Sequence, residues 1–69
     1  MNITVNGETK ELATNATVSD LLAQSDVKMP DMVSVELNDT IIPRDQYNTQ
    51  SLSDGDRVEF LYFMGGGAA

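Results

Sequence analysis

Few residues in this chain are of types that do chemistry, and the most unusual arrangement is the glycine run in its final stretch, FLYFMGGGAA. Gly65, Gly66 and Gly67 follow five large apolar residues and precede two alanines. The chain has no histidine and no cysteine, and no spacing of Ser, Lys or carboxylate side chains indicates a nucleophile with its base. We therefore expect no enzymatic centre, and the glycine run becomes the main candidate for function.

A second arrangement with possible chemistry is the pair Asp54 and Asp56 on either side of Gly55. Two carboxylates could start a cation site, but a third ligand is missing nearby, and Asp and Gly in this order are typical of a turn. We interpret them as turn residues and assign no metal and no bound cofactor.

Composition and charge narrow the classes of partner. A chain of 69 residues is expected to form one domain with a small core. Four basic against 11 acidic residues give a formal net charge of −7, which repels nucleic acid and anionic membranes and favours a basic partner surface. No apolar run is long enough to span a bilayer, and no N-terminal signal is present. We expect a cytoplasmic monomer.

The N-terminal half of the sequence indicates a hairpin followed by a helix. ITVNG alternates apolar and polar residues up to Asn6-Gly7, a pair suited to a two-residue hairpin turn, and ETKEL forms the returning strand. Thr17 stands three residues before Asp20, a weak capping-box signal because the box prefers Glu or Gln. The apolar spacing then predicts a short helix that starts near Val18 and ends near Ser25 or Asp26.

The C-terminal half indicates three further strands. MVSVELND alternates cleanly and turns at Asn38-Asp39. Pro43 limits the next strand to a short edge piece, and Asp54-Gly55 precedes the longest strand candidate. This order predicts an α+β domain with one mixed sheet, a helix on one face, and the first and last strands parallel at its centre. We predict one core that contains Ile3, Val5, Leu21, Leu22, Val35, Leu37, Val58 and Phe60.

Taken together, these segments resemble a known family. The Asn-Gly hairpin, TVSDLL, VELNDTIIPRDQY, LSDGD and an apolar strand running into glycines are similar to the ubiquitin-like β-grasp sulfur carriers of the ThiS/MoaD family. The resemblance covers essentially the whole chain, and the IIPRDQY stretch is more similar to the thiamine-biosynthesis branch, ThiS. It implies a β-grasp fold of four to five strands on one helix, with residues 1–64 as the carrier domain and 65–69 as a flexible tail.

The resemblance also implies a function and partners. The carboxylate of Gly67 would be adenylated with ATP by a partner enzyme of the ThiF/MoeB type and converted to a thiocarboxylate, with Gly65 and Gly66 as the tail. The sulfur would then pass to a thiazole synthase or another acceptor. Ala68 and Ala69 depart from the family pattern, in which the chain ends on a glycine. Either they would be removed first, for example by a protease of the JAB type, or they are a remnant of cloning.

The tail has a physical rationale of its own. A carboxylate is a poor electrophile until it becomes an acyl adenylate, so it must enter a partner's nucleotide site. An extended chain spans ~3.3 to 3.6 Å per residue, so residues 64 to 67 carry the carboxylate roughly 13 to 14 Å from the folded body. Glycines fit a narrow channel because they lack side chains and accept backbone angles closed to other residues.

The residues before the tail are candidates for partner binding. On the last strand, Val58, Phe60 and Tyr62 share one face, and Glu59, Leu61 and Phe63 share the other. Glu59 indicates that its face looks to solvent, so Leu61 and Phe63, with Met64, form either a docking patch or a surface covered by a loop around Tyr47. Arg44 is either half of a surface ion pair or a partner contact.

Three classes of function remain after this reading. A sulfur carrier in thiamine biosynthesis is the preferred one, and a carrier for sulfide assimilation into methionine or cysteine, activated by clipping, is the alternative within the same class. A ubiquitin-like modifier would instead be joined to lysines of other proteins. A plain interaction domain would do neither.

Overall fold

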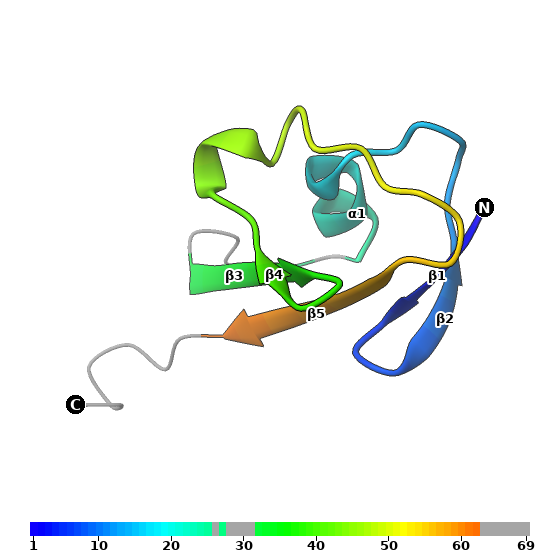
Figure 1. Ribbon diagram of the computed structural model, residues 1–69, viewed down its shortest axis with the longest axis horizontal. Coiled ribbons are helices and arrows are strands. Elements are labelled where there is room, and N and C mark those ends of the chain that lie inside the picture. Colours follow the sequence, from blue (N-terminus) through cyan, green and yellow to red (C-terminus); the bar gives the residue numbers. More distant parts are fainter. Residues whose placement is uncertain (26, 28–31, 63–69) are drawn as a thin grey trace.

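The computed structural model describes residues 1–25, 27 and 32–62, which form two layers, one sheet and one helix. The strands are β1 (Asn2–Val5), β2 (Glu8–Glu11), β3 (Val33–Leu37), β4 (Thr40–Ile41) and β5 (Arg57–Tyr62). Helix α1 (Val18–Gln24) lies across one face of the sheet, and the short 3₁₀ helix η2 (Arg44–Gln46) follows β4 (Figure 1). The predicted α+β architecture of one helix on a mixed five-stranded sheet is confirmed.

Strand β5 lies at the centre of the sheet, whose order is β2-β1-β5-β3-β4. It runs parallel to β1, as the sequence predicts, with Val5 opposite Val58. On its other side it is antiparallel to β3 along the full length of β3, from Leu37 opposite Val58 to Val33 opposite Tyr62. The last strand of the domain is therefore the central strand of the sheet.

Two hairpin turns set the register of the outer strands. Asn6 (φ 50°) and Gly7 (φ 84°) join β1 to β2, and Asn38 (φ 50°) and Asp39 (φ 71°) join β3 to β4. Positive φ at both central residues gives a turn whose twist suits a two-residue hairpin, and Asn, Asp and Gly tolerate that conformation best. Both predicted turns are confirmed.

Helix α1 begins with a complete capping box. The Thr17 hydroxyl accepts from the Asp20 backbone N–H at 3.2 Å, and the Asp20 carboxylate accepts from the Thr17 N–H at 2.9 Å. The shorter Asp side chain therefore closes the box that Glu or Gln usually closes. The helix ends at the C-cap Ser25, as predicted.

The core lies between α1 and the sheet. Seven of the eight residues predicted for it are buried, including Val35 and Phe60. The exception is Leu37, which is half-buried and packs against the core from its rim, because it is the last residue of β3 before the turn. Among the described residues no helix is long and apolar enough to cross a membrane.

Candidate functional site at the end of strand β5

The candidate site is the C-terminal end of β5, where the chain passes into the glycine run. Gly67 comes five residues after Tyr62, which bounds its distance from the end of the strand at roughly 18 Å for an extended chain. Phe63, Met64 and residues 65–69 lie outside the described residues. The expectations about the tail and about the contacts of Phe63 and Met64 therefore stay predictions.

Two asparagine side chains hold β5 in place. The Asn6 carboxamide oxygen accepts from the Phe60 N–H at 2.9 Å, and the Asn6 N–H donates to the Val58 carbonyl at 3.0 Å. On the other side, the Asn38 carboxamide oxygen accepts from the Arg57 N–H at 2.9 Å. Both turns therefore do more than reverse the chain, because they extend the hydrogen bonding along the central strand.

The carboxylates of Asp54 and Asp56 organise the turn that precedes β5. Asp54 accepts from the Asn2 N–H at 2.7 Å, and Asp56 accepts from the Ser53 N–H at 2.7 Å and from the Asn38 side chain at 3.1 Å. These bonds confirm their interpretation as turn residues. Within residues 1–25, 27 and 32–62, no group of three or more candidate ligands could hold a metal ion.

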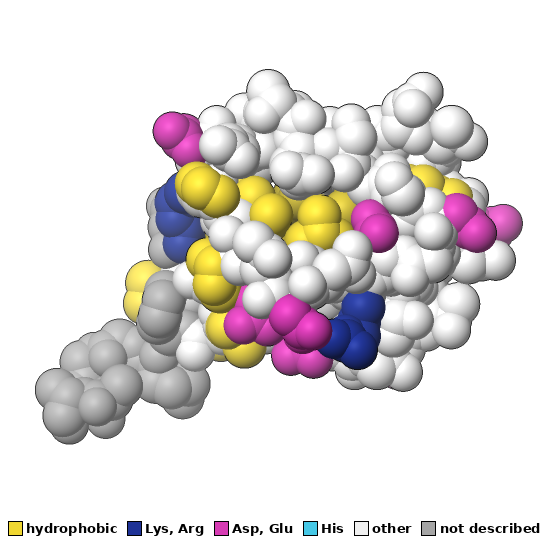
Figure 2. Space-filling view, viewed as in Figure 1, with side chains coloured by type: hydrophobic (Ala, Val, Ile, Leu, Met, Phe, Trp, Pro, Cys, Tyr) yellow, Lys and Arg dark blue, Asp and Glu magenta, His cyan; other side chains and the backbone are white. Residues whose placement is uncertain are grey.

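The face of the sheet opposite the helix carries two of the exposed large apolar residues, Leu61 and Ile41. Leu61 lies opposite Ser34 and is 39% exposed, and Ile41 lies opposite Glu36 and is 51% exposed. Glu36 and Glu59 face each other across β3 and β5. Figure 2 shows hydrophobic and acidic side chains close together near the end of β5. This mixture suits a protein surface with apolar and basic groups.

The exposure of Leu61 bears on the interpretation that a loop around Tyr47 covers it. The Tyr47 hydroxyl accepts from the Val35 N–H at 3.2 Å, and the Tyr47 side chain is buried on the helix side of the sheet. The loop around Tyr47 therefore leaves Leu61 uncovered on the opposite face. Exposure of Leu61 is what the docking-patch interpretation requires, although exposure by itself names no partner.

Sequence reasoning missed two further residues beside the site. Tyr62 faces the helix side with Val58 and Phe60, yet it is 55% exposed, because β1 does not pair with this end of β5. Ile41 is the second, and its sequence signal is a large apolar residue on a short edge strand two residues before Pro43. The exposed apolar surface therefore includes both faces of the end of β5.

Arg44 makes two contacts within the fold that the sequence did not predict. Its guanidinium donates to the Val33 carbonyl at 2.8 Å, and it lies over the Tyr47 ring, 5.6 Å from the ring centre. Because Val33 is paired with Tyr62, this contact supports β3 beside the end of β5. A structural role for Arg44 therefore accounts for these contacts.

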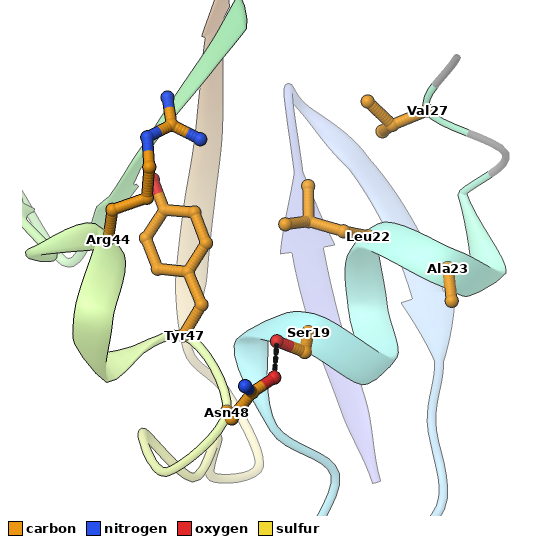
Figure 3. A pocket seen from close by; sticks show the side chains of 7 residues that line it. All are labelled: Ser19, Leu22, Ala23, Val27, Arg44, Tyr47 and Asn48. Carbon is orange, nitrogen blue, oxygen red and sulfur yellow. Dashed lines mark hydrogen bonds between the residues drawn. The ribbon is translucent and has the colours of Figure 1, made fainter. Parts of the chain in front are cut away.

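A hollow of about 380 Å³ lies between α1 and the loop after η2. Figure 3 shows its lining, with Leu22 and Val27 on one side and the Tyr47 ring with Arg44 on the other. The Ser19 hydroxyl donates to the Asn48 side chain at its lower edge. The hollow contains no nucleophile with a base, so we assign no chemistry to it.

Comparison with known proteins decides the family. The ThiS family model matches residues 3–67 of the chain, which is nearly its whole length and includes all three tail glycines. The chain belongs to the ThiS family. The resemblance of the sequence to β-grasp sulfur carriers is therefore confirmed, and the match runs through Gly67.

Solved structures of ThiS proteins have the same fold. The crystal structure of a thiamine biosynthesis protein (ThiS) from Geobacter metallireducens has a TM-score of 0.86 and 43% identity, with 97% of this chain and 100% of that chain covered. A solution structure from the same organism has a TM-score of 0.78 and 45% identity, with 97% and 88% covered. The β-grasp fold is thus common to these ThiS structures and this chain.

A curated relative shows the same segment in a larger protein. A thiazole synthase from Paramagnetospirillum magneticum (strain ATCC 700264 / AMB-1) is 35% identical over 68 residues, which is 99% of this chain. The chain spans only 21% of the length of that protein. A ThiS-like segment therefore occurs there within a longer chain named for thiazole synthesis.

Proposed function

We propose that this chain is a sulfur carrier in thiamine biosynthesis and that Gly67 is the residue that carries the sulfur. The observation that supports this most is the family match through Gly67, in a segment that continues directly from the central strand β5. A folded domain with a glycine segment leading from its central strand suits delivery of a carboxylate into a partner's recessed site.

In this proposal the partner enzymes supply the catalysis, and this chain supplies the carboxylate that accepts the sulfur. The Gly67 carboxylate attacks the α-phosphate of ATP, which releases pyrophosphate and forms an acyl adenylate. A sulfur nucleophile then displaces AMP, and the carboxyl group gains one sulfur in place of one oxygen. Because the chain has no cysteine, the thiocarboxylate would be its only nucleophilic thiolate-like sulfur.

The proposed partners follow from the two halves of this reaction. An adenylating enzyme would bind the carrier through Leu61, Phe63 and Met64 and use ATP in its own site. The relative named thiazole synthase supports the thiamine branch over sulfide assimilation into methionine or cysteine. Because the first step consumes ATP, we place the reaction in the cytoplasm.

The alanines after Gly67 bear on the same proposal. With Ala68 and Ala69 attached, the terminal carboxylate would lie up to ~7 Å further along the channel at ~3.3 to 3.6 Å per residue. Displacement on that scale abolishes a reaction that depends on placement of the reacting atoms. We therefore propose that the form ending at Ala69 requires removal of both alanines, by a protease of the JAB type or another peptidase, before it accepts sulfur.

The test compares chains that end at Gly66, Gly67 and Ala69. Each is incubated with the adenylating enzyme, ATP and a sulfide source, and the intact mass is measured. We expect the exchange of one oxygen for one sulfur only in the chain that ends at Gly67. Equal conversion of the chain that ends at Ala69 would show that the alanines belong to the working tail.

A chemical control distinguishes the thiocarboxylate from an oxidised methionine. The chain has four methionines, and one methionine sulfoxide adds nearly the same mass as the exchange of oxygen for sulfur. Iodoacetamide distinguishes them at neutral pH, because it alkylates a thiocarboxylate readily and a chain without cysteine has no thiol to compete. A chain that gains this mass but is not alkylated by iodoacetamide would carry a methionine sulfoxide and no thiocarboxylate. This result would contradict the proposed function.

A further inference from the structure

The backbone of β5 has a partner strand on only one side near its end. Strand β1 pairs with β5 at Arg57 and Val58 and then turns away at Asn6. Strand β3 continues to pair with β5 as far as Tyr62. Figure 1 shows the arrowhead of β5 well beyond the part of the strand that lies beside β1.

The direction of each backbone group on β5 follows from the observed hydrogen bonds. The Arg57 carbonyl accepts from Asn38 on the β3 side, and the Val58 carbonyl accepts from Asn6 on the β1 side. Because these groups alternate along a strand, those of Phe60 and Tyr62 also point to the β1 side. The Phe60 N–H meets the Asn6 carboxamide oxygen there, at 2.9 Å, in the place of a neighbouring strand's carbonyl.

Beyond that bond the edge has no partner in the described part of the chain. The Phe60 carbonyl and the Tyr62 N–H and carbonyl all face the β1 side, and no described residue pairs with them. Acceptor, donor and acceptor in this order are complementary to an extended backbone. Leu61 and Tyr62, exposed by 39% and 55% on opposite faces, would give an added strand apolar contacts above and below.

We propose that this edge, formed by the Phe60 carbonyl and the Tyr62 N–H and carbonyl, binds an extended segment of the adenylating enzyme by strand addition. The inference rests on the proposed function, and it names how the carrier is aligned for that reaction. A strand paired with β5 would fix the direction in which the chain continues from Tyr62 toward the nucleotide site. Main-chain bonds supply affinity in this mode of recognition, and the flanking side chains supply specificity.

Charge favours a partner protein over a second copy of the chain. Each copy carries a formal net charge of −7, so pairing two β5 edges would bring two acidic molecules together beside their Glu59 side chains. A basic groove on the enzyme would instead be attracted to the same region. The edge is also continuous with the segment that has to enter the enzyme.

Two substitutions at one position separate the backbone from the side chain. Tyr62→Pro removes the N–H that faces the edge and keeps the pairing to β3, which uses the groups of Leu61. Tyr62→Ala removes the ring and keeps the N–H. We expect Tyr62→Pro to bind the adenylating enzyme about tenfold more weakly than Tyr62→Ala, the effect of losing one hydrogen bond. Equal affinities would overturn the inference.

Hydrogen exchange of the Tyr62 amide gives a second measurement that does not depend on the folding of a variant. The amide should exchange quickly in the free protein and slowly in the complex with the enzyme. Slow exchange in the dilute free protein would mean that the chain covers its own edge, and protection that rises with concentration would mean a second copy. An unchanged rate in the complex, or either of these results, overturns the inference.

The proposed function is tested separately by the conversion to a thiocarboxylate of a chain that ends at Gly67 and has no other change. If that chain gains sulfur and Tyr62→Pro binds as well as Tyr62→Ala, the carrier function stands and strand addition is wrong. If the chain that ends at Gly67 gains no sulfur, the carrier function itself is wrong.

Discussion

At the scale of single residues, two asparagine side chains accept hydrogen bonds from β5 that the backbone of a neighbouring strand would usually accept. Asn6 and Asn38 both have φ of 50°, a conformation that Asn tolerates better than most residues. Each then uses its carboxamide oxygen to accept from a backbone N–H of β5, at Phe60 and at Arg57. The choice of Asn in each turn therefore serves both the turn and the central strand.

Leu61→Asp should weaken binding to the adenylating enzyme by at least about tenfold, because a buried interfacial leucine contributes more than 1 kcal/mol when it anchors a contact. The fold should remain intact, since the side chain is already 39% exposed in the free protein. Titration calorimetry with the enzyme measures the effect. Thr9→Asp is the matched control, because Thr9 is exposed on the same face of the sheet at the far edge strand β2. If both variants lose affinity equally, charge and not the Leu61 patch is responsible.

At the scale of elements, local hydrogen bonds begin the helix, and long-range ones fix it. The seven-residue helix α1 is too short to be stable alone. Its capping box satisfies the first N–H groups, and Val18 and Ser19 donate to the Gln50 and Tyr47 carbonyls at 3.0 and 2.9 Å. The segment after η2 therefore holds the start of α1 against the sheet.

Thr17→Ala should lower the free energy of unfolding by about 1 kcal/mol, because it removes the hydroxyl that caps the Asp20 N–H. Urea unfolding followed by circular dichroism measures the loss. Thr14→Ala is the control, since Thr14 is an exposed loop residue outside the box. A loss for Thr14→Ala as large as that for Thr17→Ala would remove the capping box as the cause.

At the scale of the whole molecule, the buried core and the exposed apolar residues lie in different parts of the domain. The core lies between α1 and the sheet, and the exposed apolar residues Leu61 and Tyr62 lie where the central strand ends. The chain as a whole has a formal net charge of −7. Glu36 and Glu59 directly opposite each other cost stability in the free domain, and this arrangement is favourable only toward a basic surface.

Raising the salt concentration should slow association with the adenylating enzyme, because salt screens the attraction between an acidic carrier and a basic groove. Glu59→Gln should reduce both the association rate and its salt dependence. The same substitution should raise the free energy of unfolding by a few tenths of a kcal/mol, because it relieves the repulsion from Glu36. Stopped-flow binding and urea unfolding measure the two effects. An association rate that does not change with salt would contradict electrostatic attraction.

The sequence by itself determined the features that depend on neighbouring residues. Asn6-Gly7 and Asn38-Asp39 specify turns through their own backbone preferences, and Thr17 with Asp20 specifies the start of the helix. Alternation in VSVEL predicted which side chains of β3 face the core, and the glycine run with its preceding segments indicated the family. In each case the physical cause acts within a few residues along the chain.

Only the tertiary structure decided the features that join distant parts of the chain. Asn6 accepts a hydrogen bond from Phe60, 54 residues away, and Arg44 reaches the carbonyl of Val33. Tyr62 has the alternation of a core residue yet is exposed, because β1 pairs with β5 only as far as Val58 and leaves one flank of Tyr62 without a strand. The alternation along a strand shows which side chains lie on the same face of the sheet. Whether another element covers that face depends on the length and register of strands that meet only in the folded molecule.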